Sequence, residues 1–183
     1  MQGIVGGGLN RYENTRNIRI GNLKRNVEGR GDGYQVGGTI EIGTQIGLGA
    51  YNLDPYVRAQ YLKLHKGTFL DSGGGDGVNL TVDAHDQTSL KGSTGFAFNR
   101  EYVMGIDSTL QATLRGNYSH EFKDAQNVFN ARFSSDSTPF TNSILLHGPD
   151  YYSAGFSVGH KDSFSSITLD YDGEATGKFT AHT

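Results

Sequence analysis

The chain has 183 residues, a formal net charge of -3 at pH 7, 35% hydrophobic residues and no cysteine. The lack of cysteine excludes a disulfide framework and thiolate metal sites, and a slightly acidic chain without an evident basic cluster argues against nucleic acid as a partner. The apolar runs, such as residues 144–146, are far shorter than the roughly twenty residues of a membrane-spanning helix.

Alternation of apolar and polar residues predicts a series of β-strands. The pattern is weak in residues 3–12 and clear in residues 34–48, where Tyr34, Ile40, Ile42 and Leu48 share one phase. A strand of this length exceeds the five or six residues typical of a soluble sheet. It suits a tilted strand that crosses a bilayer in roughly nine to eleven residues, with lipid on one side and water on the other.

Further strands follow along the chain. Residues 54–70 show the pattern with a change of phase, because Leu62 and Leu64 fall opposite to the earlier apolar residues. This change indicates either a bulge or the point where the strand leaves the bilayer. The remaining predicted strands are residues 78–98, 109–121, 151–159 and 166–172, and an eighth strand begins at Phe179.

The predicted connections alternate in length. Short turns are expected at residues 50–53 and 160–163, a medium connection at 99–107, and long polar loops at 15–32 and 134–150. Outer-membrane barrels keep short turns on the periplasmic side and long loops outside the cell, so this alternation orients the chain. Two aromatic belts are also predicted. The inner belt contains Tyr51, Tyr56, Phe96, Phe98 and Tyr102, and the outer belt contains Phe69, Phe122, Phe129, Phe133, Tyr151 and Tyr152.

Several segments resemble one known family, the C-terminal translocator barrels of bacterial autotransporters, which are type V secretion proteins. The segments are LDPYVRAQYLKLHKGTF (53–69), SLKGSTGFAF (89–98), LRGNYSHEF (114–122) and GFSVGHKDSFSSITLDYDGEATGKFTAH (155–182). Residues 10–35 are similar to barrels whose passenger is a GDSL-type esterase. The resemblance implies an all-β, antiparallel up-and-down transmembrane β-barrel in the outer membrane that anchors and exports an N-terminal passenger domain.

The same resemblance implies which partners the chain has. They are outer-membrane lipid, the protein's own passenger domain and the outer-membrane barrel assembly machinery. Family barrels have about twelve strands, whereas this chain contains seven or eight. Residues 1–183 are therefore expected to be a β-barrel domain that is truncated at both ends.

The polar phase of the strands predicts an aqueous lumen with charges of both signs. The expected lumen-lining residues are Gln35, Glu41, Gln45, Arg58, Gln60, Asp83, His85, Lys91, Gln111, Arg115, Glu121, Asp170 and Asp172. These residues either satisfy one another by ion pairing or form a hydrophilic conduit for an extended passenger. The six histidines lack metal-ligand spacing, and the adjacent Ser119, His120 and Glu121 cannot form a triad on one strand. No catalytic, cofactor or metal site is expected in this segment, and enzymatic activity would belong to the passenger.

Two alternatives remain open from the sequence. The first is a small stand-alone barrel of eight strands, a structural anchor or adhesin, in which residues 3–12 pair with the terminal segment. The second is a soluble β-barrel or β-sandwich that acts as a binding module. That class would pack its valine, isoleucine and leucine side chains together in a dry interior.

Overall fold

The computed structural model describes residues 1–75, 77–123, 126–136, 138–145, 148–176 and 179–182. These residues form one antiparallel sheet of thirteen strands. The strands are β1 (Gln2–Ile20), β2 (Leu23–Gly43), β3 (Ile46–Leu48), β4 (Tyr51–Lys66), β5 (Phe69–Ser72), β6 (Leu80–Val82), β7 (His85–Val103), β8 (Thr109–Glu121), β9 (Gln126–Phe133), β10 (Phe140–Leu145), β11 (Asp150–Lys161), β12 (Ser166–Thr176) and β13 (Phe179–His182). No helix formed by the described residues has the length and hydrophobicity needed to span a membrane.

The long strands follow one another in chain order. β1 pairs with β2, β2 with β4, and β4 with β7, and the order continues through β8, β11, β12 and β13. β3 continues the line of β2 along β4 after an interruption at Thr44 and Gln45. The predicted up-and-down order of seven strands and an eighth from Phe179 is therefore confirmed.

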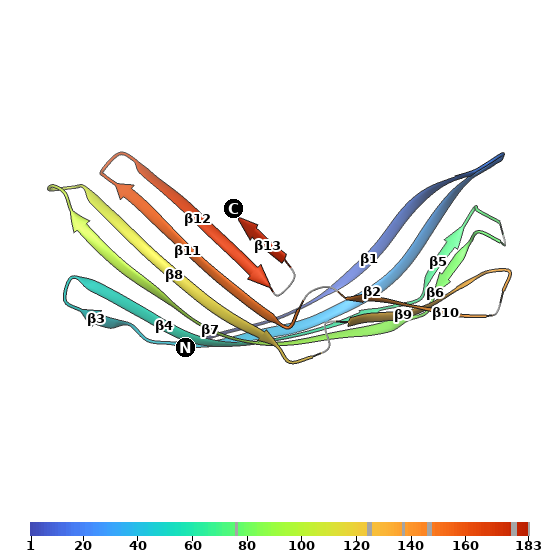
Figure 1. Ribbon diagram of the computed structural model, residues 1–183, viewed down its shortest axis with the longest axis horizontal. Coiled ribbons are helices and arrows are strands. Elements are labelled where there is room, and N and C mark those ends of the chain that lie inside the picture. The colour runs from blue at the N-terminus through green and yellow to red at the C-terminus, as the bar shows by residue number, and fades with distance from the viewer. Residues whose placement is uncertain (76, 124–125, 137, 146–147, 177–178, 183) are drawn as a thin grey trace.

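The sheet is strongly curved but not closed (Figure 1). Within the described residues, β1 pairs only with β2, and β13 pairs only with β12. The pairing of residues 3–12 with the terminal segment, which a small closed barrel requires, does not occur in this sheet. The structure therefore gives no support to the stand-alone eight-stranded barrel.

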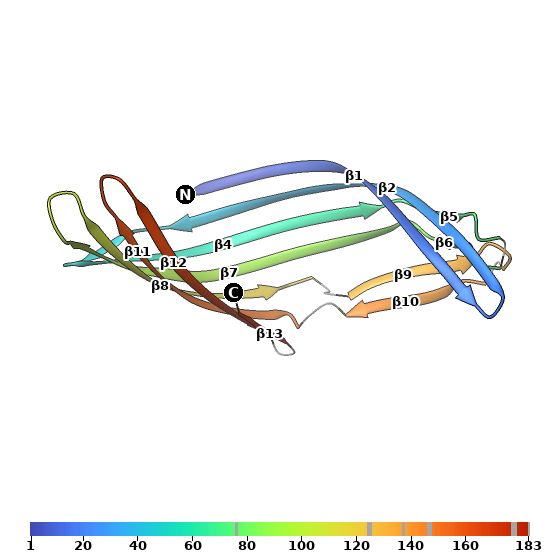
Figure 2. The ribbon, with the colours of Figure 1, turned by 90° about the horizontal axis from the view of Figure 1, so that it is seen from above.

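The two ends of the sheet are built differently. Figure 2 shows the β7–β8 and β11–β12 turns at one end, and the β1–β2 tip with the β5–β6 and β9–β10 hairpins at the other. The long strands that follow one another are called the meander: β1, β2, β4, β7, β8, β11, β12 and β13. The two small hairpins are joined to the meander because β5 pairs with β2 and β6 pairs with β9. The alternation of short and long connections is thus present, with the long ones folded into additional sheet.

Several predicted connections and strands were wrong in detail; for example, the predicted strand 54–70 is broken between β4, which ends at Lys66, and β5, which begins at Phe69. Residues 15–32 are not a loop, because β1 and β2 stay paired up to a turn at Gly21, whose φ of 57° suits the first central position of a type II′ turn. Residues 134–150 contain β10, and β7 continues to Val103 inside the predicted 99–107 connection. The predicted strand 78–98 is broken at Asp83 and Ala84 into β6 and β7. Outside the bilayer both faces of a strand meet water, so the alternation that marks strands is lost.

The register places the apolar and polar phases on opposite faces. One row across the sheet joins Ile42, Val57, Thr94, Tyr118 and Tyr152 on the apolar face. Ile42 and Val57 are 54% and 55% exposed. Among the described residues only Val27 and Ala131 are buried hydrophobic residues. The dry interior of a soluble sandwich is therefore absent from the described part of the chain.

The apolar face ends at a level marked by charged residues. β4 keeps an unbroken register with β2 and β7, so the phase change at Leu62 and Leu64 is not a bulge. On the apolar side, Lys63 Nζ lies 2.9 Å from Asp86 Oδ2, and His65 Nδ1 lies 2.6 Å from Asp86 Oδ1. These polar contacts indicate that β4 leaves the apolar band beyond Tyr61.

Tyrosines mark the upper limit of the apolar band. On the apolar face of four strands a tyrosine is the last residue before a charged residue or histidine of the same face: Tyr34 of β2, Tyr61 of β4, Tyr118 of β8 and Tyr152 of β11. The Tyr118 and Tyr152 ring centroids are 5.2 Å apart. From Tyr51 to Tyr61 the strand rises about 33 Å along its own axis. At a tilt of about 45° this length spans a band of about 25 Å, the height of the apolar surface of a transmembrane barrel.

Several predicted belt residues lie elsewhere, among them Phe129 of β9, whose ring stacks on His85 with the ring centroids 5.7 Å apart. The Tyr56 hydroxyl donates to Asn117 Oδ1 at 3.0 Å on the polar face, and Tyr151 is opposite Ser119 on the same face. The Phe69 ring lies against Gly31 in the β5–β2 extension. The belts were predicted from position along the chain, whereas the phase of each residue decides which face it occupies.

The apolar face gives a direct test of these assignments. Replacing Ile42, which lies within the apolar band, with arginine is expected to destabilise the folded domain in lipid by about 2 to 4 kcal/mol, because on this assignment the charge would face hydrocarbon. Thr39→Arg, three residues away on the polar face of β2, serves as the matched control and is expected to cost much less. Reversible unfolding in detergent or lipid measures both free energies, and equal costs at the two positions would show that the faces are assigned wrongly.

Candidate functional site

The polar face of the meander carries a continuous set of cross-strand contacts. At one level Gln2, Glu41 and Arg58 stand opposite one another on β1, β2 and β4. Gln2 Nε2 donates to Glu41 Oε1 at 2.9 Å, and Arg58 Nε donates to Glu41 Oε2 at 2.7 Å. Both oxygens of the Glu41 carboxylate are therefore occupied by neighbours on adjacent strands.

A second ion pair reaches across a whole strand. Arg115 on β8 donates from Nε to Asp172 Oδ1 at 2.9 Å and from Nη2 to Asp172 Oδ2 at 2.6 Å, although β11 lies between β8 and β12. Arg115 Nη2 also lies 3.3 Å from Asp170 Oδ1. Gly155 is the residue of β11 between the partners, and a Cβ there would overlap the Asp172 carboxylate. The absence of a side chain at Gly155 is what allows this bidentate pair to form.

Hydroxyl and amide groups fill the space between the two ion pairs. Asn117 accepts from the Tyr56 hydroxyl and donates from Nδ2 to Ser119 Oγ at 3.0 Å. Ser119 Oγ lies 2.8 Å from Ser93 Oγ on the neighbouring strand β7. Uncharged polar groups thus satisfy one another along the middle of this face.

Towards the end with the long hairpins, the carboxylate of Glu121 closes the polar face. Glu121 is 8% exposed and accepts from the Ser89 hydroxyl and from the Leu90 and Lys123 N–H groups, at 2.7 and 3.1 Å for the two backbone donors. Lys91 Nζ lies 4.5 Å from the centroid of the Tyr151 ring. These contacts fix the end of β8 against β7.

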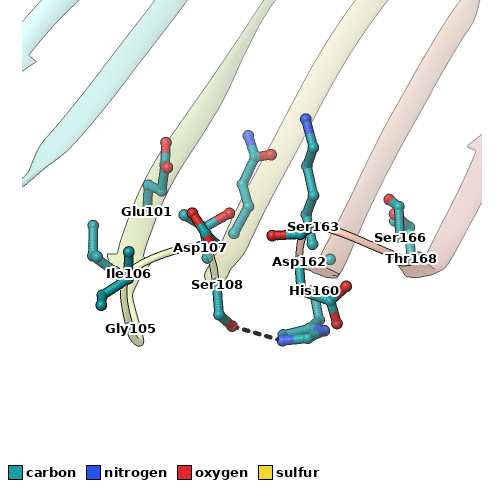
Figure 3. Close-up of a pocket in the computed structure, with 15 residues that line it drawn as sticks. Glu101, Gly105, Ile106, Asp107, Ser108, His160, Asp162, Ser163, Ser166 and Thr168 are labelled. Atoms are coloured by element: carbon teal, nitrogen blue, oxygen red, sulfur yellow. Dashed lines mark hydrogen bonds between the residues drawn. The ribbon is translucent and has the colours of Figure 1, made fainter.

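At the opposite end, a cavity of about 730 Å³ lies between the β7–β8 and β11–β12 turns (Figure 3). Ser108 Oγ and His160 Nε2, 2.9 Å apart, join the two turns. In the second turn, the Phe164 and Ser165 N–H groups donate to Asp162 and lower the pKa of its carboxyl below the usual aspartate range. The described residues contain no group of three or more histidine and carboxylate side chains that could hold a metal ion.

This geometry can be compared with known families. Residues 1–172 match the Autotransporter beta-domain family. The chain belongs to the autotransporter beta-domain family. Domains of this family are outer-membrane β-barrels that act as translocators and export a passenger domain, and they are not themselves catalytic. No curated protein matches the chain.

Most of the residues expected to line the translocator lumen share one face. The register places eleven of the thirteen on the polar face, namely Gln35, Glu41, Arg58, Gln60, His85, Lys91, Gln111, Arg115, Glu121, Asp170 and Asp172. Gln45 lies in the interruption between β2 and β3. Asp83 lies in the break between β6 and β7 and forms an ion pair with Arg132 of β9 at 2.8 Å. Asp83 is therefore paired with the β9–β10 hairpin.

Sequence reasoning missed several residues of the polar network in this translocator domain. The missed residues have the same phase as the predicted charged residues: Tyr56, Ser93, Asn117 and Ser119. The predicted lumen set contains only strongly polar side chains and therefore omits them. Asn99 was missed because residues 99–107 are predicted to be a connection, whereas Asn99 lies in β7, donates to Asp54 Oδ2 at 2.7 Å and accepts from the Thr113 hydroxyl at 2.8 Å. The phase alone would have identified all of them.

The close approach at Gly155 leads to a prediction. Gly155→Ala is expected to destabilise the complete barrel by about 1 to 3 kcal/mol, because the added methyl group displaces Asp172 from Arg115 in a closely packed site. Gly47→Ala on β3 is the control, because a Cβ there has no neighbour within 4 Å. Denaturant unfolding of both variants measures the difference, and an unchanged Gly155→Ala barrel would contradict the packing described here.

The Asp162 turn predicts a pH dependence. Because the folded-state pKa is lowered, the ionised carboxylate stabilises the turn above the pKa of the unfolded chain, and this stabilisation is lost as the pH falls through the folded-state pKa. Asp162→Ala is therefore expected to unfold more easily than the wild type at neutral pH and to converge with it in acid, once the pH has fallen below the folded-state pKa of Asp162. Melting temperatures of both barrels measured across this pH range test the prediction, and a difference that persists unchanged in acid would contradict it.

Proposed function

We propose that the polar face of this translocator domain lines the aqueous lumen through which its passenger crosses the outer membrane. The proposed lumen-lining residues are the eleven of the thirteen predicted ones that share this face, together with the hydroxyl and amide groups between them. One observation carries the proposal: polar residues occupy one face of the meander strands, opposite an apolar face that ends at a level of tyrosines. A surface of this kind suits a wall between lipid and water.

Charge pairing along the wall favours passage over retention. Glu41 with Arg58, and Arg115 with Asp170 and Asp172, satisfy each other on the wall itself. A passing segment of either charge would have to displace an existing partner to bind, and it gains little by doing so in a solvated channel. The paired wall therefore accommodates an extended chain of varied sequence.

The apolar face is proposed to contact outer-membrane lipid directly. The two edges of the sheet support a further proposal about the domain, because unpaired N–H and C=O groups in hydrocarbon cost several kcal/mol each. Residues 1–183 are proposed to form part of a larger barrel domain in which additional strands cover β1 and β13. Insertion of such a barrel would depend on the outer-membrane barrel assembly machinery.

The passenger is proposed to hold any enzymatic activity of the whole protein. Residues 10–35 support an esterase of the GDSL type only through their resemblance to barrels that carry such passengers. In the structure these residues are parts of β1 and β2 and form a hairpin. The esterase assignment stays a prediction that the passenger sequence itself would test.

Site-specific cross-linking during export tests the lumen assignment. A photoreactive residue at Gln111, on the polar face of β8, is expected to cross-link to a passenger stalled in transit. The same residue at Leu110, the preceding position on the apolar face, is expected to give lipid adducts and no passenger adduct. Passenger adducts at both positions, or at Leu110 alone, would contradict the proposed lumen.

A further inference from the structure

The β1–β2 hairpin ends in a concentration of positive charge. Residues 16–25 contain four cationic residues and no carboxylate. Arg16 forms an ion pair with Asp71 of β5. The other three, Arg19, Lys24 and Arg25, are exposed, and together they are named the basic tip. Sequence analysis did not identify this cluster, because the turn at Gly21 is what brings the two short basic segments together.

The basic tip has no balancing charge within the described chain. None of its three residues has a carboxylate within 4.0 Å among the described residues. Lower on the same hairpin the situation differs, since Arg11 lies 3.4 Å from Asp32 and Arg30 lies 3.6 Å from Glu28. The charges are therefore compensated along the hairpin and uncompensated at its end.

The arrangement at the tip opposes local stability. Arg19 is directly opposite Lys24 in the β1–β2 register, and like charges in this position destabilise a strand pair. Arg25 is opposite Ile18, so its side chain lies on the other face of the hairpin. A partner of negative charge would remove the repulsion between Arg19 and Lys24.

The distance of the basic tip from the apolar band limits which class of anionic partner can reach it. Lys24 lies ten residues along β2 from Tyr34 at the limit of the apolar band, a length of about 33 Å. Lipid headgroups extend only about 5 to 8 Å beyond the hydrocarbon core on each side. Even when the hairpin is tilted, the basic tip lies beyond the reach of headgroup phosphates.

We propose that the basic tip binds an anionic polysaccharide at the cell surface. Guanidinium and ammonium groups form strong charge-assisted hydrogen bonds with sulfate and phosphate groups. The cations occupy both faces of a narrow hairpin, so a flexible polymer reaches all three, whereas the flat surface of a folded partner meets only one face. This inference rests on the proposed function, because it requires the β1–β2 turn to lie outside the cell.

Binding of a defined polymer to cells that produce the full-length protein tests the inference. Dextran sulfate is expected to bind, and uncharged dextran of the same length is expected not to bind. The Arg19→Gln/Lys24→Gln double variant is expected to lose at least about tenfold in affinity, and the wild-type affinity is expected to fall by about thirtyfold from 50 to 200 mM salt if three contacts are made.

The matched control is the Arg11→Gln/Arg30→Gln double variant. It removes the same charge from the same face of the same hairpin, but at positions that already have a carboxylate partner. Its affinity is expected to remain within about twofold of the wild type. Equal losses in the two double variants, or equally tight binding of DNA of matched length, would overturn the inference.

Labelling of Asn22→Cys separates this inference from the proposed function. Asn22 lies in the turn beside Gly21, and a membrane-impermeant maleimide is expected to label the variant on intact cells. Labelling without polysaccharide binding would overturn the inference and leave the translocator orientation standing. A variant that is produced and folded but not labelled would overturn both.

Discussion

Within the apolar band, each long strand of this sheet has one apolar and one polar face, and successive side chains alternate between the two faces. The pleat of a β-strand sends successive side chains to opposite faces, so the alternation in the sequence determines which face is apolar before any tertiary contact forms. In residues 109–121, for example, Leu110, Leu114 and Tyr118 share one face, and Arg115 lies on the other. A shift of one residue in the pairing would expose every charge to lipid, and this penalty fixes the register.

On the polar face, the same strand geometry brings oppositely charged side chains of neighbouring strands together. Because residues directly opposite on neighbouring strands lie within reach of each other, ion pairs such as Glu41 with Arg58 form without any additional element. The pair between Arg115 and Asp172 extends this principle across β11, and Gly155 provides the space. Many charges of the polar face are therefore paired on the face itself, as the proposed passage for an extended passenger requires.

The sequence was sufficient to predict the fold class, the strand order and the faces of the strands within the apolar band. It failed where a strand has water on both sides, because the alternation then disappears. The polar β1–β2 extension and β10 were therefore interpreted as parts of loops, although Gly21 has the turn geometry of a hairpin. The aromatic belts show the related error of ignoring phase, which placed Tyr56 and Tyr151 on the lipid side.

The sequence predicted which face carries the candidate site, but it did not predict which residues of that face contact one another. The polar phase identified Arg115, Asp170 and Asp172 as residues of one face, but their pairing joins positions more than fifty residues apart and depends on Gly155 between them. The ion pair between Asp83 and Arg132 forms because β6 pairs with β9. No local sequence pattern predicts this pairing of strands. Contacts that depend on tertiary register cannot be derived from alternation alone.

The central claim is that one face of these strands lies against lipid and the other against water. A nitroxide scan along β8 of the complete barrel in lipid measures this directly, with a label at each position from Leu110 to Tyr118 in turn. Collision with oxygen should dominate at the even-numbered positions and collision with a water-soluble nickel complex at the odd-numbered ones. Accessibility without a period of two, or with the reverse phase, would contradict the account.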